Sequence, residues 1–264
     1  MGNSAPPLET TYRDGICVVT LTRPALHNRV DAELHVALTG VLNRIAGDPS
    51  VRVVVLAAQG PTFSAGGDFD LMRCGHDDPR SRRQIIEDGR RLLAALHQIP
   101  QPVVAAVQGP AIGLGATIAL SCDAIVAGPA ASFADSHVVV GLAAGDGGCL
   151  VWPATVGMVR ARRHLLTGDP LDRDAAHAMG LVTDIADTNE EVETKAHEIA
   201  RRIASLPPLA VQNTKKTLNV VTRARAAEVV EIGFALEAET LASDDLLEAI
   251  EGFRQRRAGT YTGR

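Results

Sequence analysis

The sequence has few aromatic residues, no excess of positive charge and no long apolar run, and each of these features excludes a class of protein. Aromatics make up 3% of the 264 residues, the formal net charge is −5 and the pI is near 5.9. A nucleic-acid binder would show a basic stripe with interleaved aromatics, so we expect no nucleic-acid partner. No segment has the length and apolarity to span a bilayer, and residues 1–8 lack the pattern of a secretory leader. We therefore expect a cytoplasmic protein without a membrane partner.

The four cysteines are too scattered to form a recognisable framework. Cys17, Cys74, Cys122 and Cys149 include no CxxC pair, which predicts reduced thiols rather than disulfides or zinc ligands. The sequence also has no GxxxxGK motif followed by serine or threonine, and no HExxH. These absences exclude a phosphate loop and a zinc-protease helix. We expect no bound metal and no permanently bound cofactor.

What the sequence does contain is a pair of glycine-rich segments, FSAGGD at 63–68 and AAVQGPAIGLGA at 105–116. Each follows an apolar run typical of a strand, at 51–58 and 102–107. Backbone that is nearly bare at two strand ends can place N–H groups around one oxygen, and glycine lets a substrate approach the peptide closely. The pattern predicts a site that stabilises an enolate or a tetrahedral oxyanion.

A dinucleotide-binding site is the alternative reading of the second segment, because Gly109, Gly113 and Gly115 follow a strand-like run. This segment lies far from the N-terminus, and no acidic residue follows in the expected register. Tyr12 and Tyr261 are not followed by a lysine four residues on, as a short-chain dehydrogenase would require. We therefore disfavour this alternative.

The periodicity of apolar residues predicts an α/β chain. A hairpin with a turn at Asp14-Gly15 opens the chain, and strand–loop–helix units follow it. From residue 190 onward we expect only helices, interrupted at Pro207-Pro208. The expected strands lie at 11–14, 16–22, 51–58, 102–107, 124–127, 131–133 and 181–185. The expected helices of the first half lie at 31–46, 82–97 and 114–121.

These segments, in this order, resemble the crotonase family, the enoyl-CoA hydratase/isomerase superfamily. The resemblance rests on LTRP at 21–24 with Asn28, on 63–71, 101–123 and 141–152, and on AIEGFRQRR at 249–257. It implies a right-handed spiral of ββα units over residues 1–194 and a C-terminal helical region, 195–264, that forms a homotrimer or hexamer. It also implies an acyl-CoA substrate, of which coenzyme A is a part, and lyase or isomerase chemistry of the kind found in fatty acid metabolism.

By position, the resemblance assigns the family's two oxyanion donors to the backbone N–H groups of Gly67 and Leu114. Family members usually have glycine where Leu114 stands, and the donor survives this change if Leu114 begins a helix. The resemblance also places a further set of residues beside the substrate or CoA: Ala65, Gly66, Asp68, Glu87, Gly113, Thr117 and Arg29.

The chain departs from the family at the two hydratase glutamates, whose aligned positions are Thr117 and His137. No glutamate lies between Glu87 and Glu190, so we do not expect ordinary two-glutamate hydration. His137 and Asp146 could instead form a catalytic dyad, in which the carboxylate fixes the tautomer and stabilises the imidazolium. The structural alternative is that His137 bonds a loop carbonyl and Asp146 caps the next helix.

The arrangement of His137, Asp146 and Trp152-Pro153 is also similar to the β-diketone hydrolase branch of this family, the 6-oxocamphor hydrolase type. Those enzymes cleave a carbon–carbon bond by a retro-Claisen reaction. A lysine common near the CoA phosphates is replaced by Ala25, which leaves a free β-dicarbonyl substrate open. Three hypotheses follow: an acyl-CoA enzyme acting through an enolate, a carbon–carbon hydrolase, and a catalytically silent acyl-CoA-binding protein.

Several candidate residues also have ordinary structural readings. Asp68 is expected to satisfy the backbone of its glycine loop, and Glu87 is expected on a solvated helix face. Thr117 could orient a water or fill a core position. Arg29, Lys215 or Lys216 could replace the missing contact to the CoA phosphates. Residues 75–81, including His76, are expected to form a surface loop.

Overall fold

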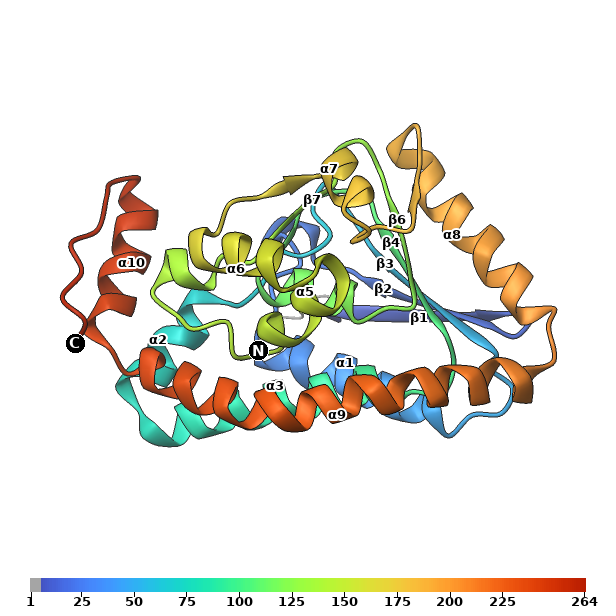
Figure 1. Cartoon of the computed structure of the whole chain (residues 1–264), viewed down its shortest axis with the longest axis horizontal. Helices are drawn as coiled ribbons and strands as arrows, with labels where there is room; N and C mark the ends of the chain where they lie inside the picture. Colours follow the sequence, from blue (N-terminus) through green and yellow to red (C-terminus); the bar gives the residue numbers. More distant parts are fainter. Residues whose placement is uncertain (1–5) are drawn as a thin grey trace.

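The computed structural model describes residues 6–264; residues 1–5, part of the segment in which we expected no leader, lie outside the described residues. A six-stranded sheet has the order β1-β2-β3-β4-β6-β9, and a smaller sheet has the order β5-β7-β8 (Figure 1). The strands are β1 (Leu8–Arg13), β2 (Ile16–Leu21), β3 (Val53–Ala58), β4 (Val103–Val107), β5 (Ala111–Ile112), β6 (Ala124–Ala127), β7 (Ser132–Ala134), β8 (Leu171–Asp172) and β9 (Asp184–Ile185).

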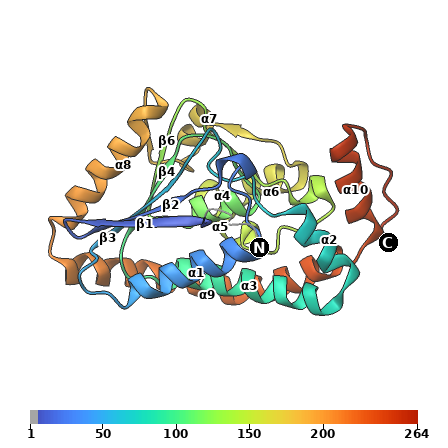
Figure 2. The same cartoon turned by 180° about the vertical axis from the view of Figure 1, so that it is seen from behind.

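Helices surround the larger sheet. Three of them, α1, α3 and α9, lie side by side, and Figures 1 and 2 show this layer from opposite sides. The helices are α1 (Ala32–Ala46), α2 (Phe69–Asp77), α3 (Pro79–Gln98), α4 (Leu114–Leu120), α5 (Gly148–Val156), α6 (Met158–Thr167), α7 (Arg173–Ala178), α8 (Asn189–Ala204), α9 (Pro208–Leu241) and α10 (Asp244–Gln255). Short 3-10 turns occur at Pro24–Leu26 and at His137–Val140.

The predicted hairpin and first helix are confirmed. β1 pairs with β2 in antiparallel register, and the turn residues Asp14 and Gly15 both adopt positive φ, at 52° and 77°. Asp31 caps α1 because its side chain accepts a hydrogen bond from the N–H of Leu34. The predicted apolar face of α1 is buried in the core.

Parallel pairing brings the two glycine-rich segments together. β3 and β4 are neighbours, with Leu56 opposite Ala105, so the loops that follow them leave the same edge of the sheet. The N–H of Ser64 donates to the carbonyl of Pro110 at 3.2 Å, and the N–H of Ile112 donates to the carbonyl of Ser64 at 2.9 Å. The two loops are therefore hydrogen-bonded to each other along their length.

The loop predicted over residues 75–81 is wrong. Residues 69–77 form α2, and α3 begins at Pro79, so only Asp78 separates the two helices. Asp68 caps α2 through the N–H of Leu71, and Asp78 caps α3 through the N–H groups of Arg80 and Ser81. Two aspartate caps in succession allow short, polar helices where composition alone indicates a loop.

The sequence predicted the helices in the second half of the chain, but it did not predict two short strands, β5 and β8. The expected strand at 181–185 shrinks to β9, and the two-residue strands β5 and β8 are too short to leave a periodic signal. The expected boundary at residue 194 falls inside α8, which packs on the larger sheet. Within the described residues 6–264, no helix combines the length and apolarity needed to cross a membrane.

A separate apolar cluster joins the C-terminal helices to the rest of the molecule. Phe234 and Leu241 of α9 pack with Leu246 and Ile250 of α10. The same cluster includes Ile86 of α3 and other side chains from the segment after His137. It fixes the second half of α9 against the segment that carries the candidate dyad.

Candidate active site

The two residues predicted to supply the oxyanion donors line one cavity. Leu114 is the first residue of α4, preceded by Gly113 with φ of 52° and ψ of −123°, a conformation that favours glycine. Within the described residues 6–264, no hydrogen bond uses the N–H of Gly67 or of Leu114. Both residues line a cavity of about 40 Å³. Two free donors on one cavity wall are what an oxyanion requires.

Close packing of the two loops depends on Gly66. Its φ is 82°, and a Cβ at this position would lie 2.5 Å from the carbonyl oxygen of Ile112. A side chain here would push the loops apart and separate the two donors. Ala65 contributes through its backbone, because its N–H donates to the carbonyl of His27 at 2.9 Å.

His137 lies between two carboxylates. Its Nδ1 is 2.7 Å from Oδ1 of Asp135, and its Nε2 is 3.0 Å from Oδ2 of Asp146. The three side chains are 6%, 1% and 7% exposed, respectively. Ionised carboxylates can only accept hydrogen bonds, so both ring nitrogens must donate and the ring is an imidazolium.

Electrostatics agree with this protonation state. Burial disfavours the charged ring, but Asp146 and Asp135 outweigh it and hold the pKa of His137 well above its usual range. One oxygen of Asp146, Oδ1, is buried without a hydrogen-bond partner among the described residues. Asp146 also lines the cavity. Asp146, rather than the ring, therefore presents a free basic atom at the site.

Glu237 completes the polar cluster from a distant part of the sequence. It comes from α9, is 6% exposed and lines the same cavity. Burial, together with Asp146 and Asp135 and against the opposing effect of His137, holds the pKa of Glu237 well above its usual range. One ring nitrogen of His137 and one carboxylate oxygen each of Asp146 and Glu237 lie within 4.8 Å of one another. Nε2 of His137 donates to Asp146, so this nitrogen carries a proton and has no lone pair to offer a cation. The arrangement therefore favours proton exchange over cation binding.

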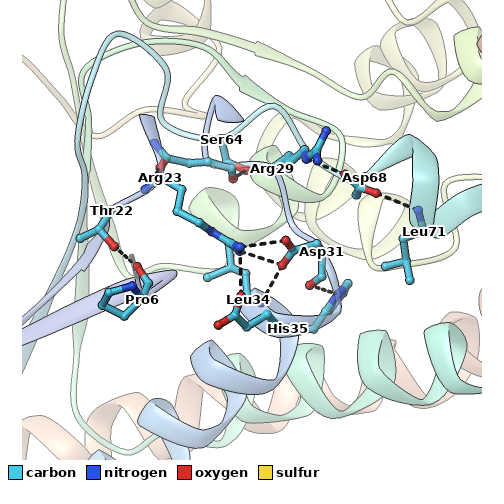
Figure 3. A network of polar contacts seen from close by, with 12 residues as sticks. Pro6, Thr22, Arg23, Arg29, Asp31, Leu34, His35, Ser64, Asp68 and Leu71 are labelled. Carbon is cyan, nitrogen blue, oxygen red and sulfur yellow. Dashed lines mark hydrogen bonds and ion pairs between the residues drawn. The ribbon is translucent and has the colours of Figure 1, made fainter. Parts of the chain in front are cut away.

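His35 is a second buried histidine on the cavity wall. Its Nδ1 lies 3.2 Å from the carbonyl of Asp31, which can only accept, so Nδ1 carries the proton and Nε2 has the lone pair (Figure 3). Burial lowers the pKa of His35, more than Asp31 and the nearby carboxylates raise it. His35 is therefore a neutral ring with a fixed tautomer.

Asp68 and Arg29 have structural partners. Asp68 accepts from the N–H of Leu71 at 2.7 Å, and its other oxygen lies 2.5 Å from Nε of Arg29 (Figure 3). This cap differs from the role that we expected, because Asp68 satisfies the backbone of α2 and not that of its glycine loop. The pair holds Arg29 beside the first glycine loop.

Three other candidates lie away from the cavity wall. Thr117 is fully buried inside α4, and its hydroxyl has no partner among the described residues. Glu87 pairs with Arg90 and Arg91 on the solvated side of α3, as expected. Lys215 requires a correction: it is buried and bonds Asp123 at 2.6 Å and the carbonyl of Gln101 at 2.9 Å. Its ammonium holds α9 to the core and does not extend to solvent, where CoA phosphates would lie.

Sequence reasoning missed Asp135, His35 and Glu237. A signal existed for Asp135, because an acidic residue two positions before a candidate histidine in a turn can contact its ring. His35 and Glu237 gave no local signal, since each occupies an ordinary helix position whose neighbour is set by tertiary packing. Asp146 does not cap α5, because that helix has Gly147 as its N-cap and no side-chain cap.

The comparisons with known proteins agree with the fold. The model of the enoyl-CoA hydratase/isomerase family matches residues 11–264. The 2,3-dehydroadipyl-CoA hydratase of Escherichia coli is 31% identical over 254 residues, covering 94% of this chain and 96% of the relative. The 1,2-epoxyphenylacetyl-CoA isomerase of the same species is 29% identical, covering 95% and 96%.

A solved structure shows the same architecture. The enoyl-CoA hydratase/isomerase from Mycobacterium paratuberculosis superposes with a TM-score of 0.89 at 32% identity, covering 95% of this chain and 99% of that one. The chain therefore belongs to the enoyl-CoA hydratase/isomerase family and has the crotonase α/β fold with a C-terminal helical region.

Proposed function

We propose that this protein is an enzyme that acts on an acyl-CoA thioester through an enolate. The N–H groups of Gly67 and Leu114 hold the enolate oxygen, and Asp146, fixed by the His137 imidazolium, transfers the proton. The observation that carries the proposal is that two unbonded N–H donors and Oδ1 of Asp146, which has no partner among the described residues, lie at a single buried cavity. The relatives' printed names, a hydratase and an isomerase of CoA thioesters, support the substrate class.

The energetic basis is that both donors bind the transition state more strongly than the ground state. Negative charge grows on the thioester oxygen as the α-proton leaves, and a fixed N–H in a dry site gains most at that moment. Each donor of this kind contributes about 3 kcal/mol in other enzymes. Asp146 is suited to accept the proton because its Oδ1 is buried and has no hydrogen-bond partner among the described residues.

The site does not support hydration by the family's two glutamates. Thr117 is sealed in the core and His137 is occupied by two carboxylates, so neither can position water in the usual way. Isomerisation of a double bond needs only proton transfer between carbon atoms of the substrate and no activated water. We therefore favour an isomerase-type reaction within this family.

A turnover assay tests the proposal. The pure protein would be offered crotonyl-CoA and 3-butenoyl-CoA in isotopically labelled water, with products identified by mass spectrometry. Conversion between the two enoyl thioesters, or label in a 3-hydroxyacyl-CoA, would support acyl-CoA chemistry. Asp146→Asn should abolish that conversion, whereas Glu87→Gln on the solvated face of α3 should leave it unchanged. Saturable binding without turnover would identify a catalytically silent acyl-CoA-binding protein instead.

A second candidate is hydrolysis of a β-diketone, and a specific observation favours it. Two cations considered for the CoA phosphates are engaged elsewhere, Arg29 by Asp68 and Lys215 by Asp123. The polar cavity is also small, and Met72, Phe234 and Leu241 supply part of its wall. A compact cyclic substrate suits such a site. Labelled oxygen in a ring-opened keto acid, formed from a cyclic β-diketone without CoA, would establish this reaction.

A further inference from the structure

We propose that Glu237 is the second proton-transfer residue of this site: it is held as a neutral carboxylic acid and donates a proton while Asp146 accepts one. The inference rests on the enolate chemistry proposed above. The chain lacks the family's two glutamates at the aligned positions, yet the structure brings two carboxyl groups to the same cavity from the segment after β7 and from α9. They are Asp146 and Glu237, separated by almost a hundred residues of sequence.

The two carboxyl groups have opposite environments. Asp146 receives a hydrogen bond from the His137 imidazolium at 3.0 Å, which favours its ionised form. Glu237 has no cationic partner in direct contact among the described residues, and its Oε2 makes no hydrogen bond there. Burial beside two ionised aspartates favours its protonated form. Paired titratable groups whose environments differ in this way mark the acid and the base of a site.

The ionisable groups that face Glu237 come from several elements. The carboxylates oppose its ionisation, and the imidazolium favours it. The surrounding groups are Asp135 and Asp146 on the connecting segments, His137 in its 3-10 turn, Cys149 of α5 and His35 of α1.

The backbone shows that the approach of Glu237 is built into the fold. Gly145 precedes Asp146, and Gly233 lies one helical turn before Glu237. A Cβ on Gly145 would collide with the carbonyl oxygen of Gly233, so the two segments touch backbone to backbone. The N–H of Ala143 also donates to the hydroxyl of Thr240 at 3.0 Å. Contacts on both sides of Glu237 hold α9 against the loop that carries Asp146.

The proton transfers balance without another reactant. Asp146 takes the α-proton, the C–H bond breaks, and its electron pair moves to the thioester oxygen as an enolate. Glu237 then gives its O–H proton to the γ-carbon, which shifts the double bond and leaves Glu237 ionised. The proton on Asp146 then passes to Glu237 within the cluster, because the carboxylate oxygens of these residues and a ring nitrogen of His137 lie within 4.8 Å of one another. Reactant and product are isomers, and both residues return to their starting states.

The test separates the two steps in deuterium oxide. Exchange of the α-protons of phenylacetyl-CoA requires Asp146 alone, whereas conversion of 3-butenoyl-CoA to crotonyl-CoA requires both groups. In Glu237→Gln, exchange should stay within about threefold of the unmodified enzyme, and conversion should fall at least about a hundredfold. Glutamine keeps the neutral side chain, so a packing role alone would be preserved. Glu239→Gln, an exposed neighbour on the same helix, is the matched control and should keep both activities.

Each outcome has a distinct meaning. Unchanged conversion in Glu237→Gln would overturn the role of Glu237 and leave the proposed function standing. An unmodified enzyme that catalyses neither exchange nor conversion would overturn the proposed function for these thioesters. In that case infrared spectroscopy still tests Glu237 at neutral pH. A carboxylic acid C=O band that disappears in Glu237→Gln but not in Glu239→Gln supports the neutral state, and an unchanged spectrum overturns it.

Discussion

At the scale of single residues, the chemistry depends on which groups carry protons. His137 is held as a cation because each of its two ring nitrogens donates a hydrogen bond to a different carboxylate. The ring therefore positions Asp146 instead of acting as a free base. His35, which lines the same cavity, is held neutral because burial outweighs the backbone carbonyl of Asp31 and the nearby carboxylates. Two histidines of one site thus differ in charge, because two carboxylates hold one ring as a cation and burial keeps the other ring neutral.

The raised pKa values predict that stability falls as pH rises. A group whose pKa is raised in the folded state binds its proton more tightly there than in the unfolded chain. Its contribution to the free energy of unfolding is therefore complete below the unfolded-state pKa and is lost as the pH rises through the folded-state pKa. For Glu237 this loss begins near pH 4.5, and for His137 it begins near pH 6.5. The slope is at most about 1.4 kcal/mol per pH unit for each group.

Urea unfolding at a series of pH values checks this expectation. Glu237→Gln should remove the decline in the free energy of unfolding that starts near pH 4.5. His137→Gln should remove the decline that starts near pH 6.5. If both variants decline in parallel with the unmodified protein across the whole range, the assigned protonation states are wrong.

The oxyanion donor on Leu114 can be removed by a single substitution. Leu114 is the first residue of α4, a position at which proline is tolerated because its N–H has no helical partner. We expect Leu114→Pro to lower kcat by about 10²–10³ relative to Leu114→Ala, which keeps the N–H. Because the Leu114 side chain is buried, both variants lose apolar packing and some stability. Leu114→Ala is therefore the control and should remain within about tenfold of the original rate. Equal kcat in the proline and alanine variants would contradict the role of this N–H.

At the scale of elements, the site is assembled where four segments meet. The loops after β3 and β4 bring Gly67 and Leu114, the segment after β7 brings His137 and Asp146, and α9 closes the cavity with Glu237. Parallel strands bring the first two together, because their carboxyl ends lie on one edge of the sheet. The approach of α9 depends instead on a contact between two glycines.

The space around each glycine predicts opposite effects on stability for Gly145→Ala, at this contact, and for Gly40→Ala, away from it. Gly145→Ala should destabilise the protein by about 1–3 kcal/mol and lower turnover, because its methyl group would displace α9 and Glu237. Gly40→Ala, inside α1 with nothing within 4 Å of the new Cβ, should stabilise it by about 0.5–1 kcal/mol. Chemical denaturation and kcat measured on both variants check the pair. Two changes of the same sign in stability would contradict the packing argument.

At the scale of the whole molecule, the exposed apolar residues point to self-association. α9 exposes Leu218 and Val221 at 65% and 66%, and α6 exposes Val159 at 82%. Exposed apolar side chains of this size are typical of surfaces covered by another chain. We propose that a homotrimer, or a hexamer of two trimers, covers part of this surface.

Light scattering after size-exclusion chromatography checks the oligomer. We expect a mass three or six times the chain mass of 27.8 kDa. The double change Leu218→Lys and Val221→Lys should shift the protein toward smaller species, while Thr214→Lys, an exposed polar position on the same helix, should not. A monomeric mass for the unmodified protein at micromolar concentration would contradict the proposal.

The sequence by itself determined the elements whose signals are local. The apolar period predicts β3, β4 and α1, and the Asp14-Gly15 turn predicts the opening hairpin. The glycine-rich loops predict the proposed oxyanion site. All these features depend on neighbouring residues. The absence of the two family glutamates is likewise a property of the sequence alone. The sequence did not predict α2, and it predicted α3 only from residue 82, because side-chain caps replace the apolar signal there.

Only the tertiary structure decided which side chains share the cavity and in which charge state. Glu237 and His35 lie on helices far from the glycine loops in sequence, and nothing in their local pattern distinguishes them from surface or core residues. Lys215 shows the same limit, because its burial against Asp123 could not be read from a basic pair on a helix. Burial and the charges of distant residues set a pKa, and these exist only once the chain has folded.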